Sequence, residues 1–192
     1  MTTLLDRVLG RTPGTVDAEI VLPDEGGALL RLVNEGDGRY DIVDKGGRSA
    51  VTPEAWSQYL YYWVDSELRE RLGASAVIEV DYYGREFAPF RLQYVSTDRD
   101  APYEGLYKEA EQRWDGVTLD DPAWKKALFI IEDFDFDSGR VQNVDASFRM
   151  EIRQDFHIGR VSVTANQELL EDLSAFPEIA PLPSIRKSPE RV

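Results

Sequence analysis

The segment that decides the fold is Val144-Asp-Ala-Ser-Phe-Arg-Met-Glu-Ile-Arg153. Apolar residues stand at every second position, and Asp, Ser, Arg, Glu and Arg fill the positions between them. A period of two places successive side chains on opposite faces of a β-strand, so the segment predicts a strand with one buried and one polar face. Strands of this one-sided kind are typical of antiparallel sheets.

Further strands are predicted on both sides of this segment. The apolar residues 127–136 predict a strand that turns at an Asp-Ser-Gly tripeptide and returns over residues 140–154. Residues 160–164 predict a last strand. Upstream, residues 76–83 also alternate, and we expect them to form a hairpin with residues 90–94 through a Tyr-Gly-Arg turn.

A long helix is predicted over residues 52–73. Thr52 is a natural N-cap, Pro53 suits the first helical position, and Gly73 can end the helix. The apolar residues between them recur at spacings of three and four, which predicts one buried stripe. The stripe consists of Trp56, Tyr59, Leu60, Trp63, Val64, Leu68 and Leu72.

Two shorter helices complete the predicted set, one within residues 100–114 and one over residues 168–176. The first fifty residues contain short β-compatible runs separated by glycine-rich turns. This block order favours an α+β fold, in which two or three helices pack on an antiparallel sheet. We therefore predict a main domain over residues 51–180, a β-rich N-terminal extension over residues 1–50, and an extended tail over residues 181–192.

Composition limits the chemistry. The 192 residues include 36 acidic and 22 basic residues, giving a net charge of -14, with one histidine and no cysteine. Thiolate nucleophiles and Cys/His metal sites are therefore excluded. The lone His157 is interpreted as a surface or turn residue, because no second histidine or activated serine accompanies it. We predict no catalytic residue, no metal and no cofactor.

The charge also bears on partners and location. An acidic surface repels phosphate backbones and anionic lipid surfaces, which disfavours nucleic acid and membrane as partners. The sequence predicts neither a signal peptide nor a transmembrane segment, so we expect a cytoplasmic protein. The oligomeric state is left open.

The densest group of acids lies between residues 132 and 137. It consists of Glu132, Asp133, Asp135 and Asp137. The spacing from Asp133 begins like a calcium loop, but Ser138 and Val144 stand where such a loop needs glycine and a bidentate glutamate. A phosphotransferase aspartate pair would need a doubly wound parallel sheet, which the upstream sequence does not predict.

The remaining interpretation is a strand end with Phe134 and Phe136 inward and the acids outward. The polar face of the strand over residues 76–83 also carries two acids. If both strands belong to one sheet, a carboxylate-rich face results, and a basic partner would relieve its repulsion. The predicted partner-binding residues are Glu79, Asp81, Glu132, Asp133, Asp135 and Asp137.

The second half of the chain resembles the YezG-like antitoxin family of immunity proteins. The matching stretches are Leu106-Tyr-Lys108 through Trp114, Trp124-Lys-Lys-Ala-Leu-Phe-Ile-Ile131, the Asp137-Ser-Gly139 turn with residues 141–148, and residues 169–177. The acidic-aromatic run comes before the turn here, whereas the family has it after the turn. The resemblance implies an inhibitor that binds one toxin and has no active site.

These observations predict an acidic immunity protein that neutralises a basic, nuclease-type toxin. Two alternatives stay open. One is a hydrolase that uses the carboxylates of residues 133–137, with or without a divalent metal. The other is a non-catalytic protein whose acidity serves only solubility.

Overall fold

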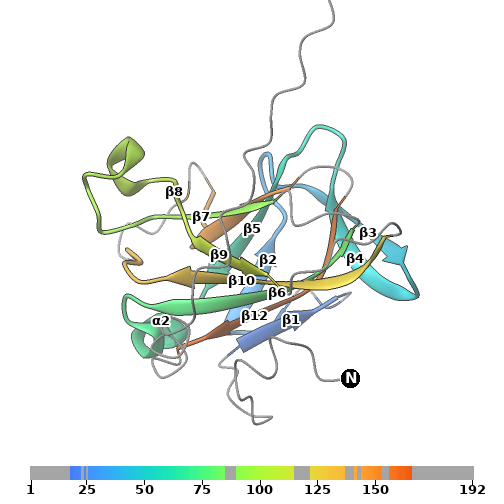
Figure 1. Cartoon of the computed structure of the whole chain (residues 1–192), viewed down its shortest axis with the longest axis horizontal. Coiled ribbons are helices and arrows are strands. Elements are labelled where there is room, and N and C mark those ends of the chain that lie inside the picture. Colours follow the sequence, from blue (N-terminus) through green and yellow to red (C-terminus); the bar gives the residue numbers. More distant parts are fainter. Residues whose placement is uncertain are drawn as a thin grey trace, which may run out of the picture.

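Two antiparallel β-sheets pack face to face and bury one apolar core between them (Figure 1). The computed structural model describes residues 18–22, 24, 26–84, 90–114, 122–136, 141, 144–152 and 156–165. The seven-stranded sheet has the order β3 (Tyr40–Lys45), β4 (Arg48–Pro53), β12 (His157–Thr164), β6 (Ala76–Gly84), β10 (Ala123–Ile131), β9 (Glu111–Trp114). Its seventh strand, β1 (Ala18–Val21), lies outside this order and pairs with β12. The five-stranded sheet has the order β2 (Leu30–Val33), β5 (Tyr59–Val64), β11 (Phe148–Glu151), β7 (Arg91–Tyr94), β8 (Lys108–Glu109).

Both alternating segments contain strands, but the second is shorter than predicted: among the described residues of 140–154, the strand β11 covers only Phe148–Glu151. In β6, Ile78, Val80 and Tyr82 enter the core, and the acids between them face away from it. In β11, Phe148 and Met150 enter the core, and the Phe148 ring stacks on Tyr62 of β5 at 5.0 Å. The period-two pattern therefore identified which side chains are buried between the sheets.

The α+β prediction is wrong, because the described residues form a β-sandwich with one short α-helix, α2 (Ser66–Leu72), and one 3-10 helix, η1 (Pro102–Gly105). The predicted helix over residues 52–73 is replaced by the end of β4, the whole of β5, and α2. Asp65 is the true N-cap, and its side chain accepts a hydrogen bond from the Glu67 amide at 2.8 Å. Gly73 ends the helix as predicted, at φ 59°.

The reason for this error lies in β5. Leu60 and Tyr62 face the core, yet Tyr61 on the opposite face is also fully buried. A strand buried on both faces has no alternation, so its apolar run can match a helical spacing by coincidence. Aromatic and β-branched side chains then favour the strand, because they pack well on a pleated surface.

Other predicted elements are corrected in the same way. The helix predicted within residues 100–114 is replaced by η1, β8 and β9. The strands β6 and β7 both exist but belong to different sheets, so they do not form a hairpin, and the same is true of β10 and β11. The helix predicted over residues 168–176 and the tail over residues 181–192 lie outside the described residues.

The strands of the first fifty residues belong to the same two sheets as the rest of the chain. β1 pairs with β12, β2 pairs with β5, and the β3–β4 hairpin joins the seven-stranded sheet through β12. This region therefore contributes to the sandwich itself. Within the described part of the chain, no helix has the length and apolar character needed to cross a membrane.

Candidate functional site

A strained loop between β7 and β8 projects from one end of the sandwich (Figure 1). We call residues 97–107 the Tyr103 loop. Tyr103 and Glu104 both adopt left-handed backbone angles, with φ of 56° and 57°. This conformation costs L-residues roughly 1–2 kcal/mol each, and such strain concentrates at functional sites. Gly105 follows at φ 82°, and a Cβ there would lie 2.7 Å from two carbonyl oxygens.

The strained backbone exposes an aromatic side chain. Tyr103 is 77% exposed, which is unusual for a large aromatic residue. Its ring meets the half-buried Tyr107 edge-on at 5.7 Å. Tyr107 is in turn fixed by Arg149, whose guanidinium lies 4.5 Å from the Tyr107 ring and 4.0 Å from the Tyr59 ring. Tyr107 therefore supports the exposed Tyr103 ring, and Arg149 holds Tyr107 in place.

Asp133 anchors both ends of the Tyr103 loop. Its carboxylate accepts hydrogen bonds from the Tyr94 hydroxyl, the Ser96 hydroxyl and the Lys108 ammonium, each at 2.6 Å. Lys108 also donates to Asp98 inside the loop at 3.1 Å. We call these side chains the Asp133 hub: Tyr94, Ser96, Asp98, Lys108 and Asp133.

The hydrogen bonds of the hub lower the pKa of Asp133 and raise the pKa of Lys108. Partial burial alone would raise the pKa of Asp133, but the donors Lys108, Ser96 and Tyr94 outweigh it and hold the pKa below its usual range. The hydrogen bond to Asp133 raises the pKa of Lys108, although desolvation opposes the shift. Both groups are therefore charged at neutral pH, which makes their hydrogen bonds strong.

Asp135 holds the Tyr103 loop at a second point, through Arg99. It accepts a hydrogen bond from Arg99 at 2.6 Å, and Arg99 also donates to the Glu104 carbonyl oxygen at 3.1 Å. The backbone adds two more links, from the Thr97 amide to the Asp133 carbonyl oxygen and from the Asp135 amide to the Val95 carbonyl oxygen. The Tyr103 loop and residues 133–135 thus form one connected unit.

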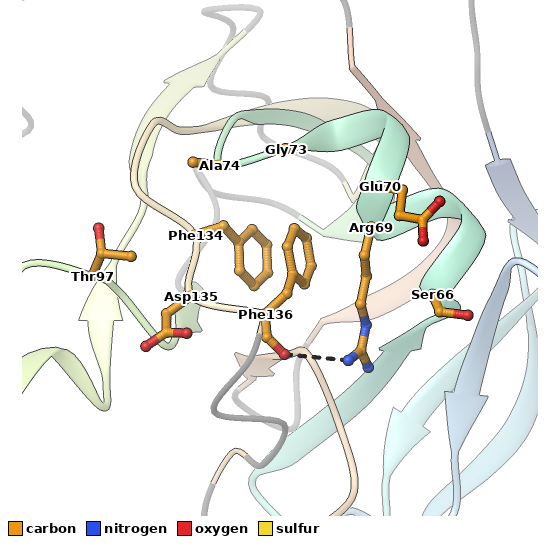
Figure 2. Close-up of a pocket in the computed structure, with 9 residues that line it drawn as sticks. All are labelled: Ser66, Arg69, Glu70, Gly73, Ala74, Thr97, Phe134, Asp135 and Phe136. Atoms are coloured by element: carbon orange, nitrogen blue, oxygen red, sulfur yellow. Dashed lines mark hydrogen bonds between the residues drawn. The ribbon is translucent and has the colours of Figure 1, made fainter.

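A shallow pocket of about 480 Å³ adjoins this unit. It lies between α2 and the segment that carries Asp135 (Figure 2). Two phenylalanine rings, Phe134 and Phe136, stack at 3.9 Å near its centre. The lining residues are Ser66, Arg69, Glu70, Gly73, Ala74, Thr97, Phe134, Asp135 and Phe136.

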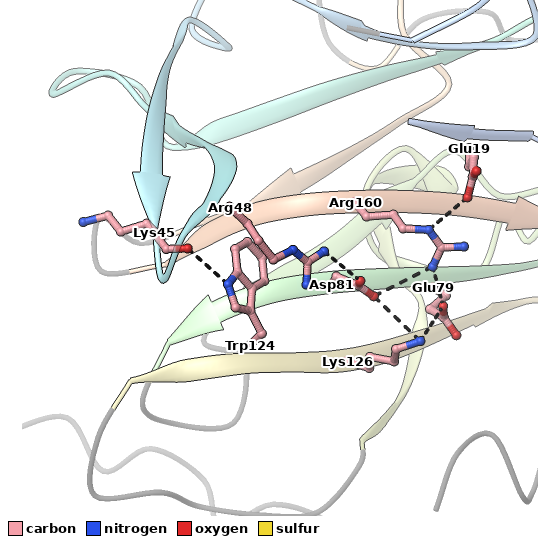
Figure 3. Close-up of polar contacts among 8 residues, drawn as sticks. All are labelled: Glu19, Lys45, Arg48, Glu79, Asp81, Trp124, Lys126 and Arg160. Carbon is pink, nitrogen blue, oxygen red and sulfur yellow. Dashed lines mark hydrogen bonds and ion pairs between the residues drawn. The ribbon is translucent and has the colours of Figure 1, made fainter. Parts of the chain in front are cut away.

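The other predicted acids lie on the outer face of the seven-stranded sheet (Figure 3). Glu79 is only 1% exposed, and it accepts from Arg160 at 2.7 Å and from Lys126 at 3.2 Å. Asp81 pairs with Arg48 at 3.3 Å. These contacts oppose each acid with cations from β4, β10 and β12, so this face is not a free array of carboxylates.

Five of the six predicted partner-binding residues are therefore divided between two places. Asp133 and Asp135 lie beside the Tyr103 loop, where they hold it in shape, and Glu132 is exposed next to them. Glu79 and Asp81 belong to the separate ion-pair group on the outer sheet face. Asp137 lies outside the described residues. Within the described ranges, no group of three or more acidic or histidine side chains could hold a metal ion.

Sequence reasoning missed Tyr103, the exposed aromatic residue of the site. The left-handed angles at Tyr103 and Glu104 give no sequence signal, because neither residue type favours them. His157 was also misplaced. It begins β12, pairs with Tyr83 and is buried, so it is not a surface or turn residue.

Comparison with known proteins adds little to this description. No protein-family model and no curated protein matches the sequence. Among solved structures, the chain is similar to a carbohydrate-binding module specific for non-crystalline cellulose, with 14% identity and a TM-score of 0.33. The match covers 81% of this chain and 93% of that one. A likeness at this level supports no functional assignment.

Proposed function

We propose that this chain is a non-catalytic binding protein that captures a basic protein partner with its Tyr103 loop. One observation carries the proposal. The backbone accepts two consecutive strained residues in order to expose Tyr103, and the Asp133 hub and Arg99 hold that arrangement in place. Exposed, supported tyrosines are frequent energetic centres of protein interfaces.

The rigidity of the loop favours this function. A flexible loop loses conformational entropy when it binds, whereas a pre-ordered loop has little left to lose. The hydrogen bonds of Asp133 connect the loop's two ends to a third part of the chain. Asp133 and Asp135 therefore support binding by fixing the loop, and the contact with a partner falls to the residues at its tip.

Charge indicates the kind of partner. The tip carries the exposed acids Asp100 and Glu104, while the cation Arg99 is already paired with Asp135. The chain as a whole has a net charge of -14. Such a field can raise the association rate with a basic protein by roughly ten- to a thousandfold. The antitoxin resemblance implies a toxin as the partner, and a nuclease-type toxin with a basic substrate groove would fit this charge.

The hydrolase alternative fits these residues less well. A carboxylate that acts as a general acid or base must reach the substrate, and its pKa has to suit the proton transfer. Asp133 instead accepts three hydrogen bonds from the protein itself, and its pKa lies below the usual range. These features favour a structural role for Asp133 within a binding site.

The test is a pull-down from the native host with the wild type and two single variants. Tyr103→Ala removes the proposed contact, and Trp56→Ala is a matched control, since Trp56 is 95% exposed on the turn between β4 and β5. We expect Tyr103→Ala to weaken capture of a basic protein by about 30-fold, and Trp56→Ala to leave it unchanged. High salt should also weaken capture. Equal capture by all three proteins would refute the proposal.

A further inference from the structure

Three apolar side chains on the outer face of the seven-stranded sheet are buried, although they point away from the core. They are Val77 on β6 and Leu128 and Ile130 on β10, and none of them is more than 7% exposed. The residues next to them in each strand, such as Ile78 and Phe129, enter the core, so these three side chains point outward. We call Val77, Leu128 and Ile130 the outer patch.

The described elements do not account for this burial. The five-stranded sheet packs on the opposite face, and neither apolar cluster formed by the described residues includes the outer patch. On the same face, the ion-pair group of Glu79, Lys126 and Arg160 borders the outer patch (Figure 3). Such neighbours lie beside the apolar side chains, and a sheet face without a covering layer stays open to water. A further segment must therefore cover the outer patch.

The C-terminal end of the described residues lies directly beside the outer patch. Thr164 pairs with Val77, and Val77 pairs with Ile130, so these residues form one row across β12, β6 and β10 (Figure 1). The row is about 10 Å long, because neighbouring strands lie about 4.8 Å apart. The chain that follows Ala165 therefore starts at one end of the row and needs only a short connection to cross it.

The sequence that follows suits this position. The helix predicted over residues 168–176 would carry its large apolar side chains within about one third of its circumference, as a helix with one buried face does. These side chains are Leu169, Leu170, Leu173 and Phe176. Such a helix is about 13 Å long, which is enough to cross the row. We infer that residues 166–176 pack across β12, β6 and β10 and cover the outer patch with this apolar stripe.

Residues 1–17 are the competing occupant, because they also contain apolar residues and join the sheet near the same point. Ala18 pairs with Val163, but β12 lies between β1 and β6, so this connection starts one strand farther from the outer patch. Segments 85–89 and 115–121 join β6 and β10 at the opposite ends of those strands. Among these segments, residues 166–176 have the shortest path.

A single introduced thiol reports whether the outer patch is covered, because the chain has no cysteine. Ile130→Cys places the thiol in the outer patch, and Ile42→Cys is the exposed control, since Ile42 is 49% exposed on β3. The reaction rate with the thiol reagent DTNB is measured for the whole chain. We expect Ile130→Cys to react at least about 100-fold more slowly than Ile42→Cys, because a covered thiol reacts only after local opening.

A second substitution identifies the segment that covers the thiol. Leu173→Glu puts a charge into the apolar stripe, so in the Ile130→Cys background it should raise the reaction rate at least about tenfold. Two controls should leave the rate unchanged. Leu5→Glu makes the same change within residues 1–17, and Glu171→Gln changes the polar side of the predicted helix.

Paired cysteines test the contact without a disruptive charge, and they decide the question if Leu173→Glu unfolds the protein. Under mild oxidation, Ile130→Cys should form a disulfide within one chain with at least one of Leu169→Cys, Leu173→Cys and Phe176→Cys. Glu171→Cys should not form it, because a disulfide needs Cβ atoms about 4 Å apart.

Four results would overturn the inference. They are fast reaction of Ile130→Cys, protection that survives Leu173→Glu, protection lost through Leu5→Glu instead, and disulfides that link two copies of the chain. None of them bears on the proposed function, because the Tyr103 loop connects strands of the five-stranded sheet. Partner capture by the wild type and Tyr103→Ala tests that function separately.

Discussion

Replacing Asp133 with asparagine should destabilise the protein through its hub. One carboxylate oxygen accepts from both Ser96 and Lys108, at 2.6 Å each, and the other accepts from Tyr94. The asparagine amide group has one acceptor oxygen, so its NH₂ group would face at least one donor. Hydrogen bonds to a charged group contribute about 1.5–3 kcal/mol each when buried.

The expected loss has to be reduced for solvent screening. The side chains of Asp133 and Lys108 are 24% and 31% exposed. Partial exposure weakens the ionic part of the interaction, while at least one of the buried hydroxyls of Tyr94 and Ser96 still loses its acceptor. We therefore expect Asp133→Asn to lower the free energy of unfolding by about 2–3 kcal/mol at pH 7.

The pH dependence provides a second readout. The pKa of Asp133 is lower in the folded state than its ordinary value, so its contribution to stability is fully present above about pH 4. That contribution is lost as the pH falls from about 4 through the lower folded pKa. The stability difference between wild type and Asp133→Asn should therefore shrink in acid.

Urea denaturation at several pH values measures both effects, and amide hydrogen exchange shows whether the Tyr103 loop loses protection first. Glu132→Gln is the matched control, because Glu132 is the exposed neighbouring acid, and it should change stability by less than about 0.5 kcal/mol. If Asp133→Asn is as stable as this control, or if their difference grows in acid, the role assigned to the hub is refuted.

Three further substitutions test other parts of the structure. Gly105→Ala forces a side chain into a left-handed position against two carbonyl oxygens, so we expect a loss of about 2 kcal/mol in chemical denaturation and weaker partner capture. Gly159→Ala would place a Cβ 2.4 Å from the Trp124 ring; the ring must move, and we expect a loss of about 1–3 kcal/mol with a shifted tryptophan emission spectrum. Glu79→Gln would leave Arg160 facing a neutral amide in a site that is 1% exposed. A loss of about 3 kcal/mol in thermal unfolding is expected, and an unchanged melting temperature would contradict the assigned ion pair.

The sequence predicts which side chains of a strand face the core better than it predicts which strands pair with one another. Alternation in β6 correctly put Glu79 and Asp81 on the face away from the core. It could not show that Arg160, from a strand that lies 81 residues away along the chain, covers Glu79. Burial of an acid by distant cations depends on sheet order, which local periodicity does not contain.

For the candidate site, the sequence likewise indicated some of the residues but not their contacts. The run of acids drew attention to Asp133 and Asp135, and both lie beside the Tyr103 loop. The sequence could not show that Lys108, Arg99 and the hydroxyl donors contact these two acids, because those groups converge on them only in the folded chain. The helix predicted within residues 100–114, which overlaps one stretch of the antitoxin resemblance, is replaced by strands at residues 108–109 and 111–114.

The position of Asp133 has a consequence for maturation of the protein. Tyr94 and Lys108 belong to the five-stranded layer, whereas Asp133 directly follows a strand of the seven-stranded layer. The Asp133 hub can form only after the two sheets have packed together. A partly folded chain therefore lacks the hydrogen bonds that hold the Tyr103 loop in shape. Under the proposed function, recognition would therefore be withheld until assembly is complete, and immature molecules would not be consumed by the partner.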